Sequence, residues 1–271
     1  MSRLIVHRES LSASPVADTA LSHALLRAVD AGEAPESLRL YRPADAMAFS
    51  VLDRTRPGFA TAVERAQIDG FDPILRLAGG RAAVFERHAL AFAWTVPARN
   101  PRAGIRARFE AISSLIARSL GALGVDARVG EVEGEYCPGE FSVNARGAVK
   151  LMGVGQRVLR RAAHVGGVVI VRDAERIARS LEAVYSALDF PLDASRTGAV
   201  EDEVPGVDAE AVADAMLREI GKQRSLVFQP VSQSRHEAAA ALQTSHATDA
   251  GVAQRAGPAA GGGKVLLRDS S

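Results

Sequence analysis

Two side chains near the middle of the chain are the best candidates for chemistry. Cys137 is the only cysteine among the 271 residues, and the Pro138 and Gly139 that follow it predict a turn that displays the side chain. A thiolate in a partly exposed loop near a cation is what covalent acyl transfer requires. A lone cysteine is otherwise more often a small buried apolar residue, so the predicted turn is what favours catalysis.

Lys150 is the second candidate, and it opens an apolar segment punctuated by glycines. Its neighbours include Val149, Leu151 and Met152. An ammonium group in such a setting needs a carbonyl, carboxylate or phosphate partner, whereas an ordinary strand lysine is solvated. If the fold brings Lys150 to Cys137, the lysine can lower the pKa of the thiol or hold the carbonyl oxygen of an acyl group.

A third segment, earlier in the chain, combines a cation with two glycines. Arg76, Gly79 and Gly80 follow a predicted buried strand. Two glycines at a strand end let the backbone approach a ligand closely, because no side chain stands in the way. The segment therefore predicts an anion or acyl-chain site, although an ordinary tight turn has the same composition.

Several other functional patterns are missing from the sequence. The six histidines have no metal-ligand spacing, and a single cysteine cannot complete a zinc set, so no metal site is expected. Neither a Gly-x-Ser-x-Gly elbow nor a Gly-x-x-x-x-Gly-Lys-Ser/Thr phosphate loop occurs. The basic residues Arg157, Arg160 and Arg161 favour a solvated face, with a docking patch for an acidic carrier protein as the alternative.

Composition bounds the class of protein but not its function. Lys and Arg number 33 against 32 for Asp and Glu, so no overall field attracts nucleic acid or an anionic membrane. One cysteine cannot form an internal disulfide, and the first seven residues are too short and polar for a secretory leader, so we expect a reducing cytoplasm. No apolar run approaches the roughly 18 residues of a membrane-spanning helix.

Hydrophobic periodicity predicts alternating helices and strands that position these candidates. Helical spacing of apolar residues, with Ser14 and Pro15 as a start signal, predicts helices over about 15–31, 57–67, 104–122, 174–187 and 207–220. Short apolar runs predict a largely antiparallel sheet with strands at 37–41, 46–50, 72–77, 82–85, 89–96, 126–132, 141–144, 149–154 and 165–171. Residues 231–271 contain few large apolar side chains, so we expect a low-complexity, disordered tail.

Three motifs, in this order, resemble the lipoate-protein ligase and octanoyltransferase family, whose catalytic fold is shared with biotin-protein ligases. They are Arg76-Leu77-Ala78-Gly79-Gly80-Arg81-Ala82, Tyr136-Cys137-Pro138-Gly139 with Phe141-Ser142-Val143, and Lys150-Leu151-Met152-Gly153-Val154-Gly155-Gln156-Arg157. The resemblance implies an α+β catalytic domain over residues 10–222, with a mixed, largely antiparallel sheet flanked by helices. It assigns the catalytic roles to Cys137 and Lys150 and places the substrate against Arg76, Gly79, Gly80, Gly153 and Gln156.

The cysteine motif is similar to one branch of that family. Its members move an octanoyl or lipoyl group between the glycine-cleavage H protein and the lipoyl domains of 2-oxoacid dehydrogenases. The resemblance therefore implies an acyltransferase of protein lipoylation with an acyl carrier or H protein as donor and such a lipoyl domain as acceptor. No cofactor, nucleic acid or membrane is implied.

The mechanism expected from this reading is a ping-pong acyl transfer. The Cys137 thiolate attacks the acyl carbonyl to give an acyl-enzyme, and the ε-amine of an acceptor lysine then displaces the cysteine. Lys150 holds the carbonyl oxygen as negative charge develops on it. Apolar residues around Leu75, Leu77, Val84 and Val154 are expected to enclose the acyl chain.

Two alternatives stay open. One is an ATP-dependent lipoate ligase that works with ATP and Mg through lipoyl-AMP, in which Cys137 is incidental. Arg81 and Phe85 stand where such ligases commonly carry a third glycine and a histidine, which disfavours adenylation. The other is a non-catalytic acyl-binding homologue, which is motivated by Ala78, Arg81 and His88 at positions where the family commonly has other residues.

Overall fold

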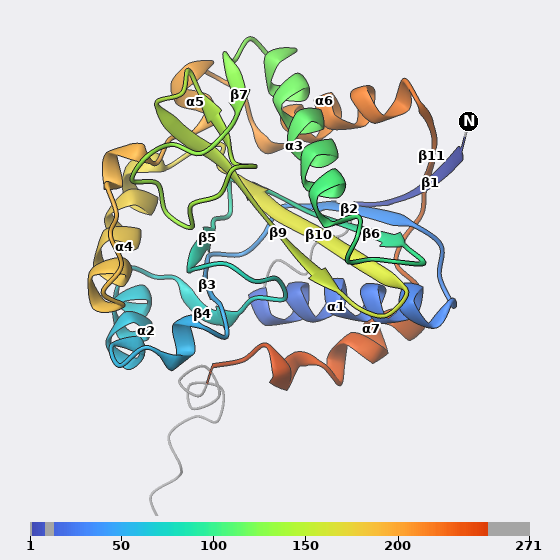
Figure 1. Ribbon diagram of the computed structural model, residues 1–271, viewed down its shortest axis with the longest axis horizontal. Helices are drawn as coiled ribbons and strands as arrows, with labels where there is room; N and C mark the ends of the chain where they lie inside the picture. The colour runs from blue at the N-terminus through green and yellow to red at the C-terminus, as the bar shows by residue number, and fades with distance from the viewer. Residues whose placement is uncertain (1, 9–13, 249–271) are drawn as a thin grey trace, which may run out of the picture.

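The protein consists of two β-sheets with helices packed around them (Figure 1). The computed structural model describes residues 2–8 and 14–248. The eight-stranded sheet has the spatial order β11 (Arg224–Phe228), β1 (Ser2–His7), β2 (Ser37–Tyr41), β6 (Leu90–Pro97), β10 (Ala162–Val169), β9 (Val149–Val158), β8 (Val143–Ala145), β7 (Ala127–Val129). The three-stranded sheet has the order β4 (Asp72–Leu75), β3 (Ala46–Phe49), β5 (Ala83–Phe85).

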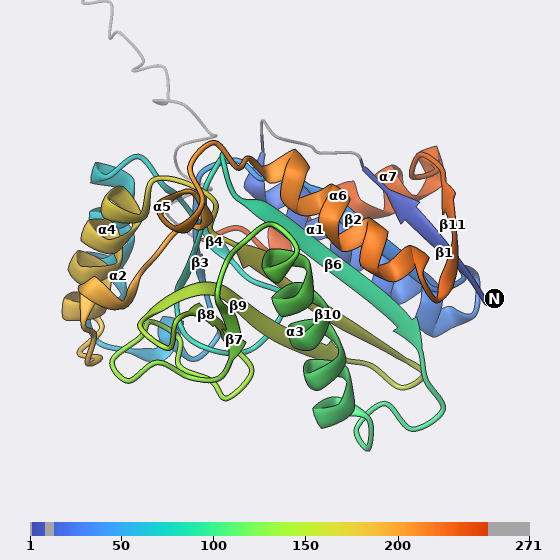
Figure 2. The same ribbon diagram turned by 90° about the horizontal axis from the view of Figure 1, so that it is seen from above.

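The helices form layers on both faces of the large sheet and beside the small one. In chain order they are α1 (Pro15–Ala31), α2 (Phe59–Ile68), α3 (Ile105–Gly121), α4 (Ala174–Ala187), α5 (Val200–Glu203), α6 (Ala209–Gly221) and α7 (Gln233–Ala240). Short 3-10 turns are η1 (Asp53–Thr55), η2 (Ala194–Arg196) and η3 (Gln243–Ser245). Figure 2 shows α3 and α6 on one face of the large sheet, with α1 on the other. The pair α2 and α4 flanks the small sheet.

Both sheets are mixed, and the large one is antiparallel around its centre. β10 pairs antiparallel with β6 and with β9, while β1 pairs parallel with β2 and with β11. The side chains of this sheet form one apolar core with α3 and α6, where Phe92, Ile116 and Met216 are almost fully buried. A second core lies between the small sheet, α2 and α4, and it contains Tyr136 and Tyr185.

Local sequence signals explain the best-predicted elements. The side chain of Ser14 accepts a hydrogen bond from the Ala17 N–H at the start of α1, and Gly32 ends the helix in the left-handed region with φ 80°. The turn between β8 and β9 places Arg146 and Gly147 at positive φ, as a tight hairpin requires. The predicted α+β fold with a mixed sheet and flanking helices is confirmed.

Two expectations about the ends of the domain are wrong. Strands β1 and β11 extend the large sheet beyond residues 10–222, and neither was predicted because their apolar runs are short and their partners are distant in sequence. The expected disorder is wrong for residues 231–248, where α7 packs against α1 through Ala239 and the following residues pair with β4. The remainder of that tail, 249–271, lies outside the described residues.

Membrane insertion through a helix is not supported by the described part of the chain. Across residues 2–8 and 14–248, every helix is too short or too polar to span a bilayer.

Candidate active site

Cys137 lies where three segments of the chain meet. Its own turn connects β7 with β8, residues 76–81 lead from β4 to β5, and Lys150 lies near the start of β9. The backbone N–H of Arg76 donates to the carbonyl of Phe49 at 2.8 Å, which continues the pairing of β4 with β3 and fixes where this second segment begins. Cys137 itself is half-buried and packs against the second core.

The backbone of Cys137 is held on both sides by buried side chains. Its φ is 42°, which is unusual for a residue other than glycine and costs about 1–3 kcal/mol. The N–H donates to the Tyr185 hydroxyl oxygen at 2.6 Å, and the carbonyl accepts from Lys150 Nζ at 2.9 Å. The fold therefore keeps a strained turn in place through two distant side chains.

The Lys150 ammonium is buried, and all of its hydrogen atoms have acceptors. Its side chain is 1% exposed. Nζ donates to Glu135 Oε1 at 2.9 Å, to the carbonyl of Tyr136 at 2.8 Å and to the carbonyl of Cys137. An ammonium group has three donors, so this geometry uses each of them within the protein. The sequence predicted that Lys150, in its apolar surroundings, needs a polar partner. That partner is the Glu135 carboxylate together with two backbone carbonyls.

Glu135 organises the turn from within. Its Oε1 accepts from the Gly139 N–H at 3.2 Å and from the Ser142 hydroxyl at 2.6 Å, while Oε2 accepts from the Val132 N–H at 3.1 Å. The side chain is fully buried. A buried carboxylate needs such a set of donors together with a cation. Sequence reasoning missed Glu135, although its place two residues before Cys137 was a usable signal.

Arg76 is the cationic side chain that lies next to the Cys137 sulfur. Its Nη1 lies 3.8 Å from Cys137 Sγ and donates to the carbonyl of Arg81 at 2.8 Å. The backbone N–H of Arg81 donates to Sγ at 3.2 Å. Two donors therefore face the sulfur, and one of them is positively charged.

Gly80 lets this segment approach the cysteine. Its φ is +114°, and a Cβ built on it would lie 2.8 Å from Cys137 Sγ. Gly79 differs, because a Cβ there would meet nothing within 4 Å. The sequence predicted that the two glycines let the backbone approach a ligand; the close approach in the structure is that of Gly80 to Cys137.

The two remaining predicted substrate residues serve different neighbours. A Cβ on Gly153 would lie 3.4 Å from Lys150 Cε, so this glycine leaves room for the buried lysine. The Gln156 side chain accepts from Arg108 Nε at 2.9 Å and donates to the Ile105 carbonyl at 2.7 Å. Gln156 therefore ties β9 to the start of α3.

Tyr185 is a second residue that sequence reasoning missed. Its hydroxyl accepts from the Cys137 N–H and donates to the Ala82 carbonyl at 2.9 Å, so it joins the cysteine turn to the end of the Arg76 segment. Burial raises the pKa of Tyr185 well above its ordinary value, which keeps the hydroxyl protonated and able to donate. Within the sequence it is one apolar position of the 174–187 helix, and nothing local marks it.

A narrow cavity of about 50 Å³ lies beside Arg76, on the α1 side of the large sheet. Its wall includes Leu77, Ala78, Phe92, Ala93 and His164, and Arg76 borders both this cavity and the Cys137 sulfur. Of the residues expected to enclose an acyl chain, Leu77 lines the cavity.

The other three residues expected around the acyl chain lie in the apolar cores. Leu75 and Val84 belong to the second core, and Val154 packs against the first.

Solved structures with the same fold are lipoate-protein ligases. Lipoate-protein ligase A bound with ATP superposes with a TM-score of 0.73 and 18% identity, over 90% of this chain and 94% of that one. A bi-partite lipoate protein ligase from Thermoplasma acidophilum, described with its E2 lipoyl domain, gives 0.66 and 17%, over 90% and 92%. These similarities establish the fold.

Curated relatives are acyltransferases. An octanoyl-GcvH:protein N-octanoyltransferase from Geobacillus kaustophilus is 28% identical over 56% of this chain and 51% of its own length. An enzyme of the same name from an Exiguobacterium species is 30% identical over 49% and 45%. A lipoyl-GcvH:protein N-lipoyltransferase from Listeria monocytogenes is 24% identical over 58% and 55%. Each match spans about half of the relative.

The family assignment follows from a match to most of the domain. The family model for the lipoyl protein ligase A/B catalytic domain matches residues 14–221, which include the Arg76 segment, the Cys137 turn and Lys150. The fold and the motif order agree with that match. The chain belongs to the lipoyl protein ligase A/B catalytic domain family.

Proposed function

We propose that this protein is an acyltransferase of protein lipoylation that moves an octanoyl or lipoyl group through a Cys137 acyl-enzyme. The donor is a glycine-cleavage H protein or another acyl carrier, and the acceptor is the lysine of a lipoyl domain of a 2-oxoacid dehydrogenase. The names of the curated relatives support the reaction class. The observation that carries the mechanism is the half-buried Cys137 sulfur facing the Arg81 N–H and the Arg76 guanidinium.

The first half-reaction loads the enzyme. The Cys137 thiolate attacks the acyl carbonyl carbon, a carbon–sulfur bond forms, and the bond from that carbon to the carrier breaks while the departing carrier atom takes up a proton. In the second half-reaction the acceptor ε-amine attacks the thioester and loses a proton. A carbon–nitrogen bond forms, the carbon–sulfur bond breaks, and Cys137 is regenerated.

We assign to different residues the two roles that the sequence offered as alternatives for Lys150. All three Lys150 donors are used by Glu135, Tyr136 and Cys137, so we assign Lys150 to holding the cysteine turn. Arg76 then supplies the charge at the sulfur, and the Arg81 N–H is a preorganised donor beside it.

The acyl chain is assigned to the cavity beside Arg76. Its wall includes small and apolar residues such as Ala78, Phe92 and Ala93, which suit a hydrocarbon chain, together with polar residues such as Ser22 and His164. At about 50 Å³ the cavity is smaller than an octanoyl chain, so the proposal includes widening of the pocket when the chain enters. Arg76 borders both the pocket and the sulfur, which supports a binding mode with the carbonyl end at Cys137.

Intact-mass measurement tests the acyl-enzyme. After incubation with octanoylated H protein, the wild-type mass should rise by one octanoyl group, and an added lipoyl domain should remove it. The Cys137→Ala protein should show neither the adduct nor transfer, while a thermal melt confirms that it is folded. Full transfer by Cys137→Ala would exclude this mechanism.

The same preparation separates the two alternatives. An ATP-dependent ligase releases pyrophosphate when given free lipoate with ATP and Mg, whereas the proposed transferase needs neither. A non-catalytic acyl-binding homologue gains thermal stability with octanoylated carrier but forms no product with any donor and acceptor pair. Pyrophosphate release that survives Cys137→Ala would replace the transferase proposal with ligation.

A further inference from the structure

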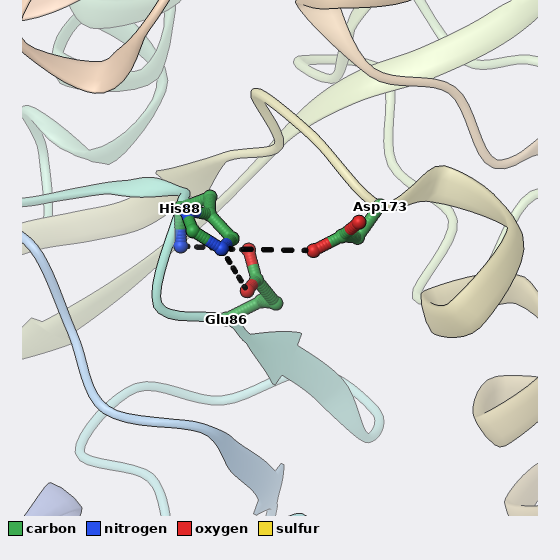
Figure 3. A group of neighbouring side chains, drawn as sticks. All are labelled: Glu86, His88 and Asp173. Carbon is green, nitrogen blue, oxygen red and sulfur yellow. Dashed lines mark hydrogen bonds and ion pairs between the residues drawn. The ribbon is translucent and has the colours of Figure 1, made fainter.

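A second group of reactive side chains lies apart from the Cys137 turn. Glu86 and His88 belong to the turn between β5 and β6, and Asp173 is the residue before α4 (Figure 3). One ligand atom from each residue lies within 4.8 Å of the others. The Nε2 of His88 is 4.0 Å from Glu86 Oε1 and 3.9 Å from Asp173 Oδ2, and Figure 3 shows the three side chains pointing toward one another.

Glu86 carries an oxygen for which the described residues offer no hydrogen-bond donor. Its side chain is 1% exposed, and Oε2 accepts from the His88 N–H at 2.8 Å. The other oxygen, Oε1, is buried, faces His88 and accepts no hydrogen bond from residues 2–8 or 14–248. A buried carboxylate oxygen without a hydrogen-bond donor is an available ligand atom for a cation.

Asp173 is also turned toward the group instead of toward its helix. It occupies the N-cap position of α4, yet its side chain accepts no hydrogen bond from the first turn of that helix. A carboxylate at this position would ordinarily cap the helix. Its Oδ2 faces His88 Nε2 instead.

The neighbouring arginines are engaged elsewhere. Arg87 and Arg176 both pair with Asp45, and Arg172 lies 3.1 Å from Glu201. Within the described ranges, no lysine or arginine nitrogen lies within 4.0 Å of a Glu86 or Asp173 oxygen. Two carboxylates and one imidazole therefore share a small volume, with His88 as the ion-pair partner that the structure records for both acids.

We propose that Glu86, His88 and Asp173 bind one divalent transition-metal cation such as Zn²⁺. Two carboxylate oxygens and one imidazole nitrogen are a common donor set for Zn²⁺, Co²⁺ and Mn²⁺, whose bonds are about 2.0–2.2 Å long. The recorded atom separations require only a small closure of the side chains around the ion. A cleft of about 290 Å³ borders His88, so water can complete the coordination.

The proposed ion has a structural role that reaches the nucleophile candidate. It would fasten the β5–β6 turn to the start of α4, and α4 carries Tyr185, whose hydroxyl holds the Cys137 N–H. Sequence spacing could not reveal the site, because Asp173 lies 85 residues beyond His88. The ion would tighten the scaffold without touching the acyl group.

Co²⁺ titration of the full chain tests the proposal, because Co²⁺ bound to imidazole and carboxylates absorbs visible light while a cysteine ligand adds a sulfur charge-transfer band. The titration is done with Cys137→Ser, which removes the one competing thiolate. We expect one equivalent of Co²⁺ to bind, Zn²⁺ to displace it, and Zn²⁺ to raise the melting temperature.

Variants of the ligands decide the location. Glu86→Gln and His88→Gln should each weaken Zn²⁺ binding by at least about tenfold, while His236→Gln, at a partly exposed histidine on α7, should not change it. A thermal melt without metal shows that each variant is folded. If Asp173→Asn and His88→Gln bind Zn²⁺ as tightly as the parent, or if the parent binds none, the proposal is wrong.

Discussion

The Nζ of Lys150 lies 2.9 Å from the carbonyl oxygen of Cys137, while the sulfur of the same cysteine faces Arg76. The two residues that carry the family motifs therefore meet through the backbone of the cysteine. This contact, with the Glu135 pair behind it, makes the shape of the turn dependent on a buried charge. Activity and stability should then respond together when that charge is removed.

Lys150→Met should unfold more easily and lose transfer activity. The substitution leaves Glu135 buried without its cation, and breaking a buried pair in this way costs about 3–5 kcal/mol. Urea unfolding measures the loss. The double variant with Glu135→Gln should be less destabilised than the sum of the single variants, because each single change strands a charge. Additive losses would mean that the pair is not coupled.

Tyr185→Phe should lower the stability of the protein, whereas Tyr136→Phe should not, although both side chains are buried. Removing the Tyr185 hydroxyl leaves the Cys137 N–H and the Ala82 carbonyl without their recorded partner, which costs about 1–3 kcal/mol. The Tyr136 hydroxyl has no hydrogen-bond partner among the described residues, so its removal should be neutral or stabilising. Unfolding curves and the rate of acyl-enzyme formation check both, and equal effects would contradict the assignment.

Gly80→Ala should slow alkylation of Cys137 and octanoyl transfer, whereas Gly79→Ala should not. The added methyl group at Gly80 would lie 2.8 Å from the sulfur, and φ +114° is strained for alanine. At Gly79 the space is open. Iodoacetamide labelling followed by mass spectrometry gives the alkylation rates. Similar rates for the two variants would show that the recorded approach of Gly80 to Cys137 does not persist in solution.

The lowered pKa of His164 should make the free energy of unfolding decrease in mild acid. Burial, with smaller contributions from His23 and Arg76, lowers the pKa of His164 from 6.5 to about 4. Between these two values the unfolded chain binds more protons than the folded one, so this contribution is complete above pH 6.5 and falls as pH falls toward 4. The slope from one such group is at most about 1.4 kcal/mol per pH unit.

The His164→Gln variant isolates that contribution. Its free energy of unfolding should change less between pH 7 and pH 5 than that of the wild type, as measured by urea unfolding at both values. His23, whose pKa is also lowered to about 4, should leave a residual slope in the variant. An unchanged slope in His164→Gln would show that His164 is not kept neutral by the fold.

Ala93→Val should discriminate between acyl chains of different length. Ala93 is buried in the wall of the cavity beside Arg76, and added methyl groups reduce the space there. Transfer of an octanoyl group should fall more than transfer of a butyryl group from the same carrier. Equal losses for both donors would place the acyl chain elsewhere.

Much of the architecture could be predicted because local signals and short-range periodicity determine it. Ser14 with Pro15, and the apolar stripe of the 174–187 helix, specify helices whose bounds the structure reproduces closely. Strands β1 and β11 were missed because they pair with each other across more than two hundred residues, and β11 has no other strand beside it in the sheet. The burial of β11 is partial and irregular, and β1 has four consecutive buried residues, so neither strand shows a clear period of two.

The sequence identified the residues of the candidate site whose type or local setting is unusual. Cys137, Lys150 and Gly80 are marked by a turn, an unusual charge and a glycine pair, and the fold brings them together. Glu135 and Tyr185 were not found because a buried acid and a helical tyrosine look like ordinary structure until their partners are known. The direction of the Lys150 ammonium, toward backbone carbonyls, is set by packing that no local pattern contains.

The pairing of residues 246–248 with β4 has a practical meaning for anyone preparing this protein. The Leu75 N–H donates to the His246 carbonyl at 2.9 Å, immediately before Arg76, and Ala247 bridges to Ile74. A recombinant version that ends at residue 221, where the family match ends, would lose this pairing with β4. It would also lose β11, the strand at one edge of the large sheet. Expression plasmids should therefore carry the gene through at least codon 248, and affinity tags belong beyond it.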